Sequence, residues 1–568
     1  MKKTHLPIIV ALMACFLAGT DCPAWSKIIY VNTQAAGNAN GADWANAFTR
    51  IAPAVVAAGI NDEIWVARGR YPEAVLMKSG TALYGGFAGT ESLREQRNWK
   101  GNETILDGGG LANSTVVTAE DTVLDGFTVT GGSNRGVWCK MATFQMAHCL
   151  ITGNREYGLF ISDSCKPSVT DCEISNNGRG VMCANRSAPT LILCVIRDNR
   201  TKSSGGGVVC ESRSTPALIS CVITGNTAGE AGGGMYVTSV ASPQITQCMI
   251  AGNIAGVSGG GVFCGLGALP KLENCAIVGN RARDTGGVYA ADSYPTLIHC
   301  TIAGNTMGGF FATIKSRLTL KNCIVWNPGT EITGDSLHRY ENDLILFSCV
   351  QGGWPGRGNI GYYPQFKDPP NGDFRLLNGS PCIDSASPEA RAMVDLDGRP
   401  RPGEDGWVDM GAYESPPEYR PVTVPAPRTL YVRSTADPGG DGSSWDQAMD
   451  TIGMALFVTN ASDEIWVAGG TYRESIWLEP NVALYGGFAG LETSRESRNR
   501  SANETIIDAT GLHTMASVTG AGGALLDSFT VTGGEACGVY CDGTFLSLTD
   551  CVITGNSTYV EGWCGPAG

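Results

Sequence analysis

The sequence is poor in charge, in histidine and in long apolar runs. Charged residues make up 17% of the 568, and acidic residues outnumber basic ones by 54 to 40, for a net charge of −14. This balance excludes a strongly basic nucleic-acid-binding protein. Beyond residue 18, no stretch reaches the roughly 18 consecutive apolar residues that a membrane-spanning helix needs. None of the five histidines is paired with cysteine at the spacing of a zinc site, so the sequence predicts no bound metal.

The N-terminus is typical of a secretory signal peptide. Two lysines precede an apolar run over 6–18, which is too short to remain as a membrane span. Small residues up to Ser26 predict cleavage there, which would remove 1–26 and leave an extracellular or cell-surface protein. A lipobox-like stretch ending at Cys15 leaves open a lipid anchor as the alternative.

The sequence also contains a repeated phrase, Cys-x-Ile-x-Gly-Asn, as in the run from Cys221 to Asn226. The phrase recurs in strict or looser form at spacings of 22 to 27 residues, starting at Cys149, Cys172, Cys194, Cys221, Cys248, Cys275, Cys300 and Cys323. A period in this range indicates stacked supersecondary units. A proline stands five residues before six of these cysteines, as Pro216 does before Cys221, and proline suits the start of a strand.

Each repeat has the pattern of two or three short strands. The cysteine and the Ile or Val two positions later alternate with polar or small neighbours, so both should point inward. We expect the closing asparagine, such as Asn226, to adopt the left-handed conformation and to hydrogen-bond its counterpart in the next coil. A second strand has the pattern Gly-x-x-Cys, as at 207–210, and follows a glycine-rich bend. The repeats therefore predict an all-β protein, a parallel β-helix.

These repeats resemble those of secreted right-handed parallel β-helix proteins of the pectin-lyase-like superfamily. They look most like the Gly-Gly-x-hydrophobic and x-x-x-Asn repeats of chlamydial polymorphic outer-membrane proteins. The motifs at 379–384 and 408–414 resemble the terminal segment of bacterial surface-anchored β-helix proteins. The resemblance implies a right-handed solenoid, but it does not select a function, because this fold hosts lyases, hydrolases, esterases and non-catalytic adhesins.

The order of the motifs predicts two modules. The run Asp-Glu-Ile-Trp-Val-Ala at 62–67 returns 401 residues later at 463–468. We expect a helical cap over 45–58, interrupted by Pro53, because an open solenoid end needs a lid. The predicted segments are 27–415 for the first module (28–130 as its start and cap, 131–350 as repeats, 351–415 as terminal segment), 416–428 for a proline-rich linker, and 429–568 for a second module that is incomplete at Gly568.

The cysteine content allows two interpretations. Of the 21 cysteines, 19 follow residue 26, an odd number, and most of them fall on the repeat period. A cysteine-rich exported protein usually contains disulfides. However, the equivalent position holds Val237 or Ala290 in other repeats, which favours small buried hydrophobic residues and mostly reduced stacks. Stacked cysteines would lie about 4.8 Å apart, so disulfides remain open.

An aromatic column is the main candidate binding site. By alternation, the residue before the cysteine of each Gly-x-x-Cys strand faces outward, in the order Trp138, Phe160, Met182, Val209, Tyr236, Phe263, Tyr289 and Phe311. The rings could stack on the apolar faces of a sugar chain, or on one another so as to stiffen the sheet. The predicted ligand-binding residues are Trp138, Phe160, Tyr236, Phe263, Tyr289 and Phe311.

The sequence shows no catalytic constellation. A lyase would need clustered carboxylates that hold calcium and a Lys or Arg base, and a hydrolase would need paired aspartates. Asp107 and Asp125, which recur as Asp508 and Asp527, lie near small residues that are typical of turns. The run 395–398 resembles a calcium loop without its remaining ligands.

Lys140, Glu211 and Lys315 flank the aromatic column, and we interpret them as solvated surface residues. The sequence thus predicts an exported, adhesin-like scaffold that binds polysaccharide or a partner surface, without a cofactor or nucleic acid and without a transmembrane span in the mature chain. The alternative is a polysaccharide lyase, with calcium, or a glycoside hydrolase. A purely structural surface-layer stalk is a third interpretation.

Overall fold

The computed structural model describes residues 27–313, 315–329, 332–333, 344–354, 356–387, 394–404, 406–421, 427–460, 463–479, 481–512, 514–520, 523–541 and 546–557. The predicted signal peptide and residues 422–426 of the predicted linker lie outside these residues. Within the described ranges, no helix is both long and apolar enough to cross a membrane. The chain forms two compact units: unit 1 is Met1–Leu297, Thr313–Leu318 and Ala392–Arg401, and unit 2 is Ile298–Ala312, Thr319–Arg391 and Pro402–Gly568.

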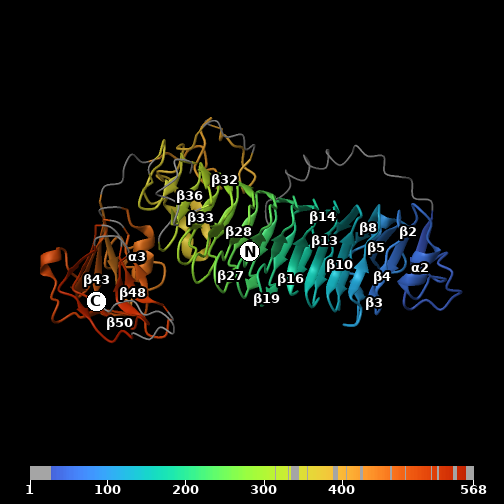
Figure 1. Cartoon of the computed structure of the whole chain (residues 1–568), viewed down its shortest axis with the longest axis horizontal. Helices are drawn as coiled ribbons and strands as arrows, with labels where there is room; N and C mark the ends of the chain where they lie inside the picture. The colour runs from blue at the N-terminus through green and yellow to red at the C-terminus, as the bar shows by residue number, and fades with distance from the viewer. Residues whose placement is uncertain are drawn as a thin grey trace. The chain divides into compact units, whose positions relative to one another are not determined.

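Unit 1 is built from three parallel sheets whose strands follow one another in successive coils (Figure 1). Sheet A contains β1 (Ile28–Val31), β2 (Glu63–Ala67), β5 (Ala82–Phe87), β8 (Thr122–Asp125), β11 (Phe144–Ala147), β14 (Ser168–Thr170), β17 (Thr190–Ile192), β21 (Ala217–Ile219), β25 (Gln244–Thr246), β29 (Lys271–Glu273) and β32 (Thr296–Ile298), which ends at the unit boundary. Sheet B contains β3 (Gly69–Tyr71), β6 (Thr104–Asp107), β9 (Thr128–Thr130), β12 (Leu150–Thr152), β15 (Glu173–Ser175), β18 (Val195–Arg197), β22 (Val222–Thr224), β26 (Met249–Ala251) and β30 (Ala276–Val278).

Sheet C completes each coil. It contains β4 (Val75–Leu76), β7 (Ser114–Val117), β10 (Arg135–Lys140), β13 (Tyr157–Ser162), β16 (Arg179–Cys183), β20 (Val208–Cys210), β24 (Met235–Val237), β28 (Val262–Gly265) and β31 (Val288–Ala291). The longest coils carry a fourth short strand, β19 (Arg200–Thr201), β23 (Thr227–Ala228) or β27 (Ile254–Ala255). These coils therefore have four strands, one more than the two or three predicted, and the extra strands pair with one another in a short sheet of their own.

The right-handed parallel β-helix predicted from the repeats is confirmed. The repeat cysteines and the isoleucines that follow them are buried in the core, as expected from their alternation with polar residues. The asparagine ladder is also present: the Asn226 amide accepts a hydrogen bond from Asn199 (2.9 Å) and donates one to Asn253 (3.0 Å). The left-handed residue is the one before the asparagine, such as Gly225 with φ 66°. The expectation that the asparagine itself is left-handed was wrong, because its side chain must point inward to form the ladder.

A short helix, α2 (Ile51–Ala57), precedes the coils. It is shorter than the predicted 45–58, and Pro53 lies in its first turn, where a missing N–H is tolerated. The Glu73 carboxylate accepts hydrogen bonds from the backbone N–H groups of Ile51 (2.7 Å) and Ala52 (3.1 Å). A distant carboxylate thus caps the helix, since no neighbouring side chain does so. The 3-10 turn η1 (Arg94–Gln96) lies between β5 and β6.

Unit 2 begins with coils of the same kind. Their strands are β33 (Thr301–Ala303), β36 (Ile324–Trp326) and β39 (Cys349–Val350), then β34 (Phe310–Ala312) with β37 (Ile332–Thr333), and β35 (Thr319–Lys321) with β38 (Leu344–Leu346). An antiparallel hairpin follows, formed by β40 (Phe366–Asp368), the turn η2 (Pro369–Asn371) and β41 (Asp373–Leu376).

The second set of coils in unit 2 repeats the start of unit 1. Its sheets are β42 (Thr429–Val432), β43 (Glu464–Ala468), β46 (Ala483–Phe488), β49 (Ala524–Asp527) and β52 (Leu546–Thr549); β44 (Gly470–Tyr472), β47 (Thr505–Asp508), β50 (Thr530–Thr532) and β53 (Val552–Ile553); and β45 (Ile476–Trp477), β48 (Ala516–Thr519) and β51 (Cys537–Tyr540). Helix α3 (Ile452–Val458) and the turn η3 (Arg495–Ser497) repeat α2 and η1. Glu474 binds the start of α3 as Glu73 binds the start of α2.

Candidate functional site

The predicted aromatic column lies on sheet C, and its members are in register from strand to strand. In unit 1 the order is Trp138, Phe160, Met182, Val209, Tyr236, Phe263 and Tyr289. The aromatic side chains are half-buried, whereas Met182 and Val209 are only 8% and 4% exposed. Phe311, the last predicted member, is half-buried on β34 of unit 2. Their role in ligand binding remains a prediction.

Three rings of the column stack on one another. The centroids of Tyr236 and Phe263 are 5.0 Å apart with planes at 9°, and those of Phe263 and Tyr289 are 5.5 Å apart with planes at 8°. Both faces of Phe263 are therefore occupied, and a sugar ring could not stack on either of them. In this part of the column the geometry favours mutual stacking, the alternative that the sequence left open.

The glycine-rich bends run close to these rings. A Cβ added at Gly232 would lie 2.8 Å from the Cβ of Tyr236, and one added at Gly205 would lie 2.2 Å from a methyl group of Val209. Both glycines have positive φ, near 70° and 79°. The bends therefore require glycine for space as well as for conformation, and they contribute to the burial of Val209.

Cations cover the other end of the column. The Arg135 guanidinium carbon lies 4.7 Å from the ring centre of Trp138 and 4.5 Å from that of Phe160. The Lys140 ammonium lies 5.7 Å from the Trp138 ring, and Arg179 lies 5.5 Å from the ring of Tyr157. Such contacts are favourable because the face of an aromatic ring is electron-rich. We call Arg135, Lys140 and Arg179 the cationic patch.

In the described part of the chain, Arg135 has no charged partner. No ion pair found among the described residues includes Arg135, and within that part of the chain its buried Nε atom has no hydrogen-bond partner. Burial lowers the pKa of the guanidinium, and the charge of Tyr157 opposes this change. An arginine remains charged even so, which leaves a partly desolvated positive charge on this face of sheet C.

Acidic side chains lie further along the column. Burial raises the pKa of Glu211, and the nearby Arg179 opposes this shift. Arg179 itself donates to the hydroxyl of Ser203 and lies 4.0 Å from Glu156, at the limit of an ion pair.

Lys315, also predicted to be a solvated surface residue, is exposed and lies 3.7 Å from a carboxylate oxygen of Asp292.

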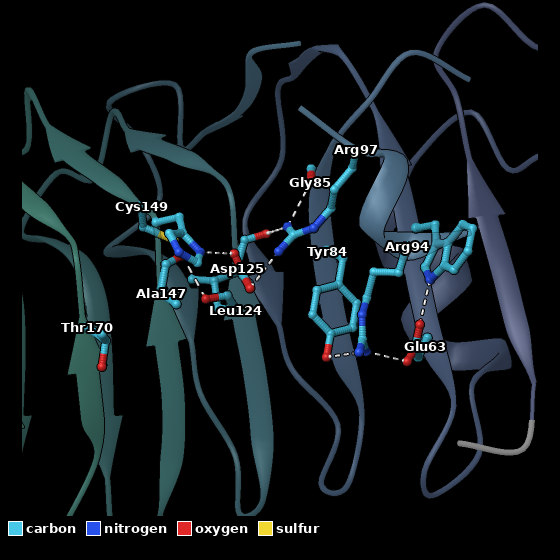
Figure 2. A network of polar contacts seen from close by, with 12 residues as sticks. Glu63, Tyr84, Gly85, Arg94, Arg97, Leu124, Asp125, Ala147, Cys149 and Thr170 are labelled. Carbon is cyan, nitrogen blue, oxygen red and sulfur yellow. Dashed lines mark hydrogen bonds and ion pairs between the residues drawn. The ribbon is translucent and has the colours of Figure 1, made fainter. Parts of the chain in front are cut away.

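A second polar constellation lies at the start of unit 1 (Figure 2). The Asp125 carboxylate accepts hydrogen bonds from Arg97 (2.7 Å) and from the Nδ1 atom of His148 (2.9 Å). Arg94 donates to Glu63 (2.7 Å) and to the hydroxyl of Tyr84 (3.0 Å). Both arginines come from residues 88–102, which we call the strap. The constellation thus fastens the strap to sheet A.

The prediction that Asp125 forms a turn was wrong. Its side chain is buried in an ion pair with Arg97. Burial alone would raise the pKa of Asp125, but hydrogen bonds from His148 and Arg97 and the charge of Arg97 outweigh it, and the pKa lies below its ordinary value. Asp107 also forms an ion pair, with Arg70, but its carboxylate in addition accepts a hydrogen bond from the backbone of Gly109 (2.9 Å), as expected of a turn residue.

Unit 2 repeats this constellation. Arg498 binds Asp527 at 2.9 Å, and Arg495 binds both Glu464 and Tyr485 at 2.8 Å. Because both copies keep these arginine–carboxylate contacts, we interpret them as structural. These arginines were not among the predicted site residues, although each recurs with its acidic partner at an offset of 401 or 402 residues, a pattern that is visible in the sequence.

The two copies differ at one contact. In unit 1 the rings of Trp99 and His148 pack together, with centroids 4.2 Å apart. The equivalent residues in unit 2 are Arg500 and Asp550, which form an ion pair. In the first copy, therefore, a histidine stacked on the strap faces Asp125, and in the second an arginine faces Asp527.

The cysteines and the calcium-like run 395–398 are two further sets of candidate residues. Cys139 and Cys165 form a disulfide, an exception to the mostly reduced stacks that the repeats predict, whereas Cys194 and Cys221 are stacked thiols. Among the described residues, no group of three His, Cys, Asp or Glu side chains is arranged to hold a metal ion. Asp395, in the calcium-like run, accepts a hydrogen bond from the backbone of Arg399 (2.7 Å) and thereby closes a turn.

Comparison with known proteins supports the fold. A family model described as "Right handed beta helix region" matches residues 102–231 and 195–344. Similar solved structures are pectate lyase Pel9A (12% identity, TM-score 0.43, 69% of this chain and 97% of that chain), XylC in complex with xylose (9%, 0.42, 60% and 87%) and the PL6 family alginate lyase AlyGC (11%, 0.34, 93% and 76%). No curated protein matches the chain. The family model and the parallel coils together show a right-handed parallel β-helix.

Proposed function

We propose that the protein is an exported β-helix scaffold that binds acidic polysaccharide on sheet C, at the end of the column formed by Trp138 and Phe160. The observation that carries the proposal is the position of Arg135. Its guanidinium lies over two aromatic rings and has no carboxylate partner in the described part of the chain.

An anionic sugar would complete this site in two ways. A carboxylate or sulfate group could accept hydrogen bonds from the Arg135 guanidinium. These bonds would replace the hydrogen bonds to water that the guanidinium loses on burial. Lys140 and Arg179 lie over neighbouring rings and would bind further charges along the chain. The protein as a whole carries a net charge of −14, so attraction of a polyanion depends on this patch and should weaken with salt.

The test is a binding assay of the full chain against polygalacturonate, alginate and a neutral xylan. We expect the two acidic polymers to bind, and we expect Arg135→Ala to weaken their binding about tenfold. Arg186→Ala, which removes an exposed cation outside sheet C, is the matched control. Equal binding by the two variants would exclude the cationic patch as the site.

The same assay tests the alternative of a polysaccharide lyase. Ultraviolet absorbance reports the unsaturated products of a lyase, and the measurement is made with and without added calcium. An increase in absorbance would show lyase activity and would contradict the proposal of a binding scaffold without catalysis. Export is tested separately by N-terminal sequencing of the protein recovered outside the cell, which should begin at Lys27.

A further inference from the structure

A groove of about 560 Å³ lies on the outer side of sheet A, next to the constellation that fastens the strap. Its volume is within the range of small-molecule sites, roughly 300–1,000 Å³. Strands β8 and β11 form its floor, where Gln145 pairs with Val123 and Ala147 pairs with Asp125. Tyr84 lines it from β5. The groove is separate from the aromatic column, which lies on sheet C.

Two polar groups of the groove are fixed in place. Arg94 donates to the oxygen of Tyr84, and burial raises the pKa of Tyr84 to about 12 despite the opposing charge of Arg94. The hydroxyl therefore keeps its proton at neutral pH and can donate it. Each oxygen of Asp125 accepts one hydrogen bond, from Arg97 or from His148, and can accept another.

The remaining lining suits a neutral sugar. Exposed Gln145 can both donate and accept, and Ile60 is an apolar group that is 72% exposed. The two exposed charges of the lining, Lys166 and Asp121, are of opposite sign, and the charge of Asp125 is balanced by Arg97. A net charge on the ligand would find no excess of opposite charge here. The hydroxyl groups of a neutral sugar could hydrogen-bond to these donors and acceptors, and its apolar ring face could contact Ile60.

The geometry points to this groove as a binding site for a neutral oligosaccharide, independent of the acidic polysaccharide site on sheet C. The second copy of the framework provides a control. It keeps Tyr485 and Asp527, but Ser547 stands where Gln145 stands in unit 1, and Thr549 stands in place of Ala147. The long amide side chain is thus specific to the first copy, and binding that depends on it should be absent from the second.

The experiment is calorimetric titration of the full chain with xylotetraose, cellotetraose and mannotetraose, at low and high salt. We expect at least one of these to bind with little salt dependence. Gln145→Ala should weaken that binding about tenfold, since it removes a donor and an acceptor. Gln145→Trp should abolish it by filling the groove. Position 145 is exposed, so both variants should fold.

Ser547→Ala and Arg135→Ala are controls that should bind the tetraose as the unaltered chain does. The proposal is overturned if none of the three tetraoses binds, or if both Gln145 variants bind as tightly as the unaltered chain. Loss of tetraose binding in Arg135→Ala would place the sugar on sheet C and would also overturn it. If Arg135→Ala does not weaken binding of the acidic polymers, the proposed function is wrong, but the tetraose titrations still test the groove.

Discussion

The rings of Tyr236 and Phe263 stack face to face, with centroids 5.0 Å apart and planes 9° from parallel. Tyr289 packs on the opposite face of Phe263. Aromatic residues at one position in successive coils therefore bind one another, because the spacing of parallel strands, about 4.8 Å, is close to the stacking distance of the rings. The column is first of all a stabilising feature of sheet C.

Replacing Phe263 with Ala should lower the free energy of unfolding by about 2 kcal/mol, because it removes two ring contacts and half-buried apolar surface. Urea denaturation measures the change, and Tyr294→Ala, at a residue that is 42% exposed, is the control. A variant in which Tyr236, Phe263 and Tyr289 are all serine should be less stable still. Unchanged stability with loss of glycan binding would instead assign the three rings to a ligand.

The asparagine ladder should be more sensitive to substitution. Buried Asn226 donates to the carbonyl oxygen of Ile196 (2.9 Å) as well as to the next asparagine of the ladder. Asn226→Ala leaves several buried groups without partners and should cost about 3 kcal/mol of stability. Asn40→Ala removes an exposed hydrogen bond from the backbone N–H of Ala42 (3.0 Å) and should cost less than about 0.5 kcal/mol. Equal midpoints for the two variants in urea would contradict this account of the ladder.

The fold could be predicted from sequence because each coil repeats the same inward residues. The cysteine, the following isoleucine and the asparagine of the phrase around Asn226 each have one environment, which recurs in coil after coil. Local pattern was sufficient for these positions, since period, alternation and turn chemistry all agree.

The candidate sites could not be predicted in this way, because they depend on contacts between different positions of the repeat. Arg135 begins its strand, and alternation gives no indication that its guanidinium lies over the rings of Trp138 and Phe160. Arg97 reaches Asp125 from a strap that lies outside the repeated phrase and returns in unit 2, where Arg498 binds Asp527. Only the internal duplication carries a signal for that pair, and comparison of the two copies by residue type would have found it.

Acid should weaken the protein through Asp125. The folded pKa of this carboxyl lies below its ordinary value of about 3.9, so its contribution to stability is present above that value and is lost as the pH falls toward the folded pKa. Asp125→Asn should therefore make stability less dependent on pH between about pH 5 and pH 2. The free energy of unfolding is measured against pH for both chains, with Asp527→Asn as the matched variant of unit 2. Parallel curves for the unaltered chain and Asp125→Asn would contradict the prediction.

Thiol reactivity should separate the core cysteines from the exposed ones. Burial raises the pKa of Cys264 to about 12, so almost no thiolate is present at pH 8, and the side chain is inaccessible as well. Cys541 is exposed. Brief alkylation of the native protein followed by peptide mapping should label Cys541 and leave Cys264 unmodified, and denaturation should make both reactive. Early labelling of Cys264 would show that the coils open readily in solution.

Helix α3 differs from α2 in one residue that changes its environment. Within unit 2, the ring of Phe457 packs against Tyr363 and Phe366, with centroids 6.3 and 6.5 Å away, and its carbonyl oxygen accepts a hydrogen bond from the indole of Trp326. The equivalent residue of α2, Val56, is 78% exposed.

Phe457→Ala should therefore destabilise unit 2 by about 3 kcal/mol, and Val56→Ala should change stability by less than about 0.5 kcal/mol. Hydrogen exchange followed by mass spectrometry locates the effect, which should appear as faster exchange in α3 and in the strand β36 that carries Trp326. Equal effects of the two substitutions would mean that the ring contacts of Phe457 contribute nothing. A difference of the expected size would show that contacts with Trp326, Tyr363 and Phe366 stabilise α3 within unit 2.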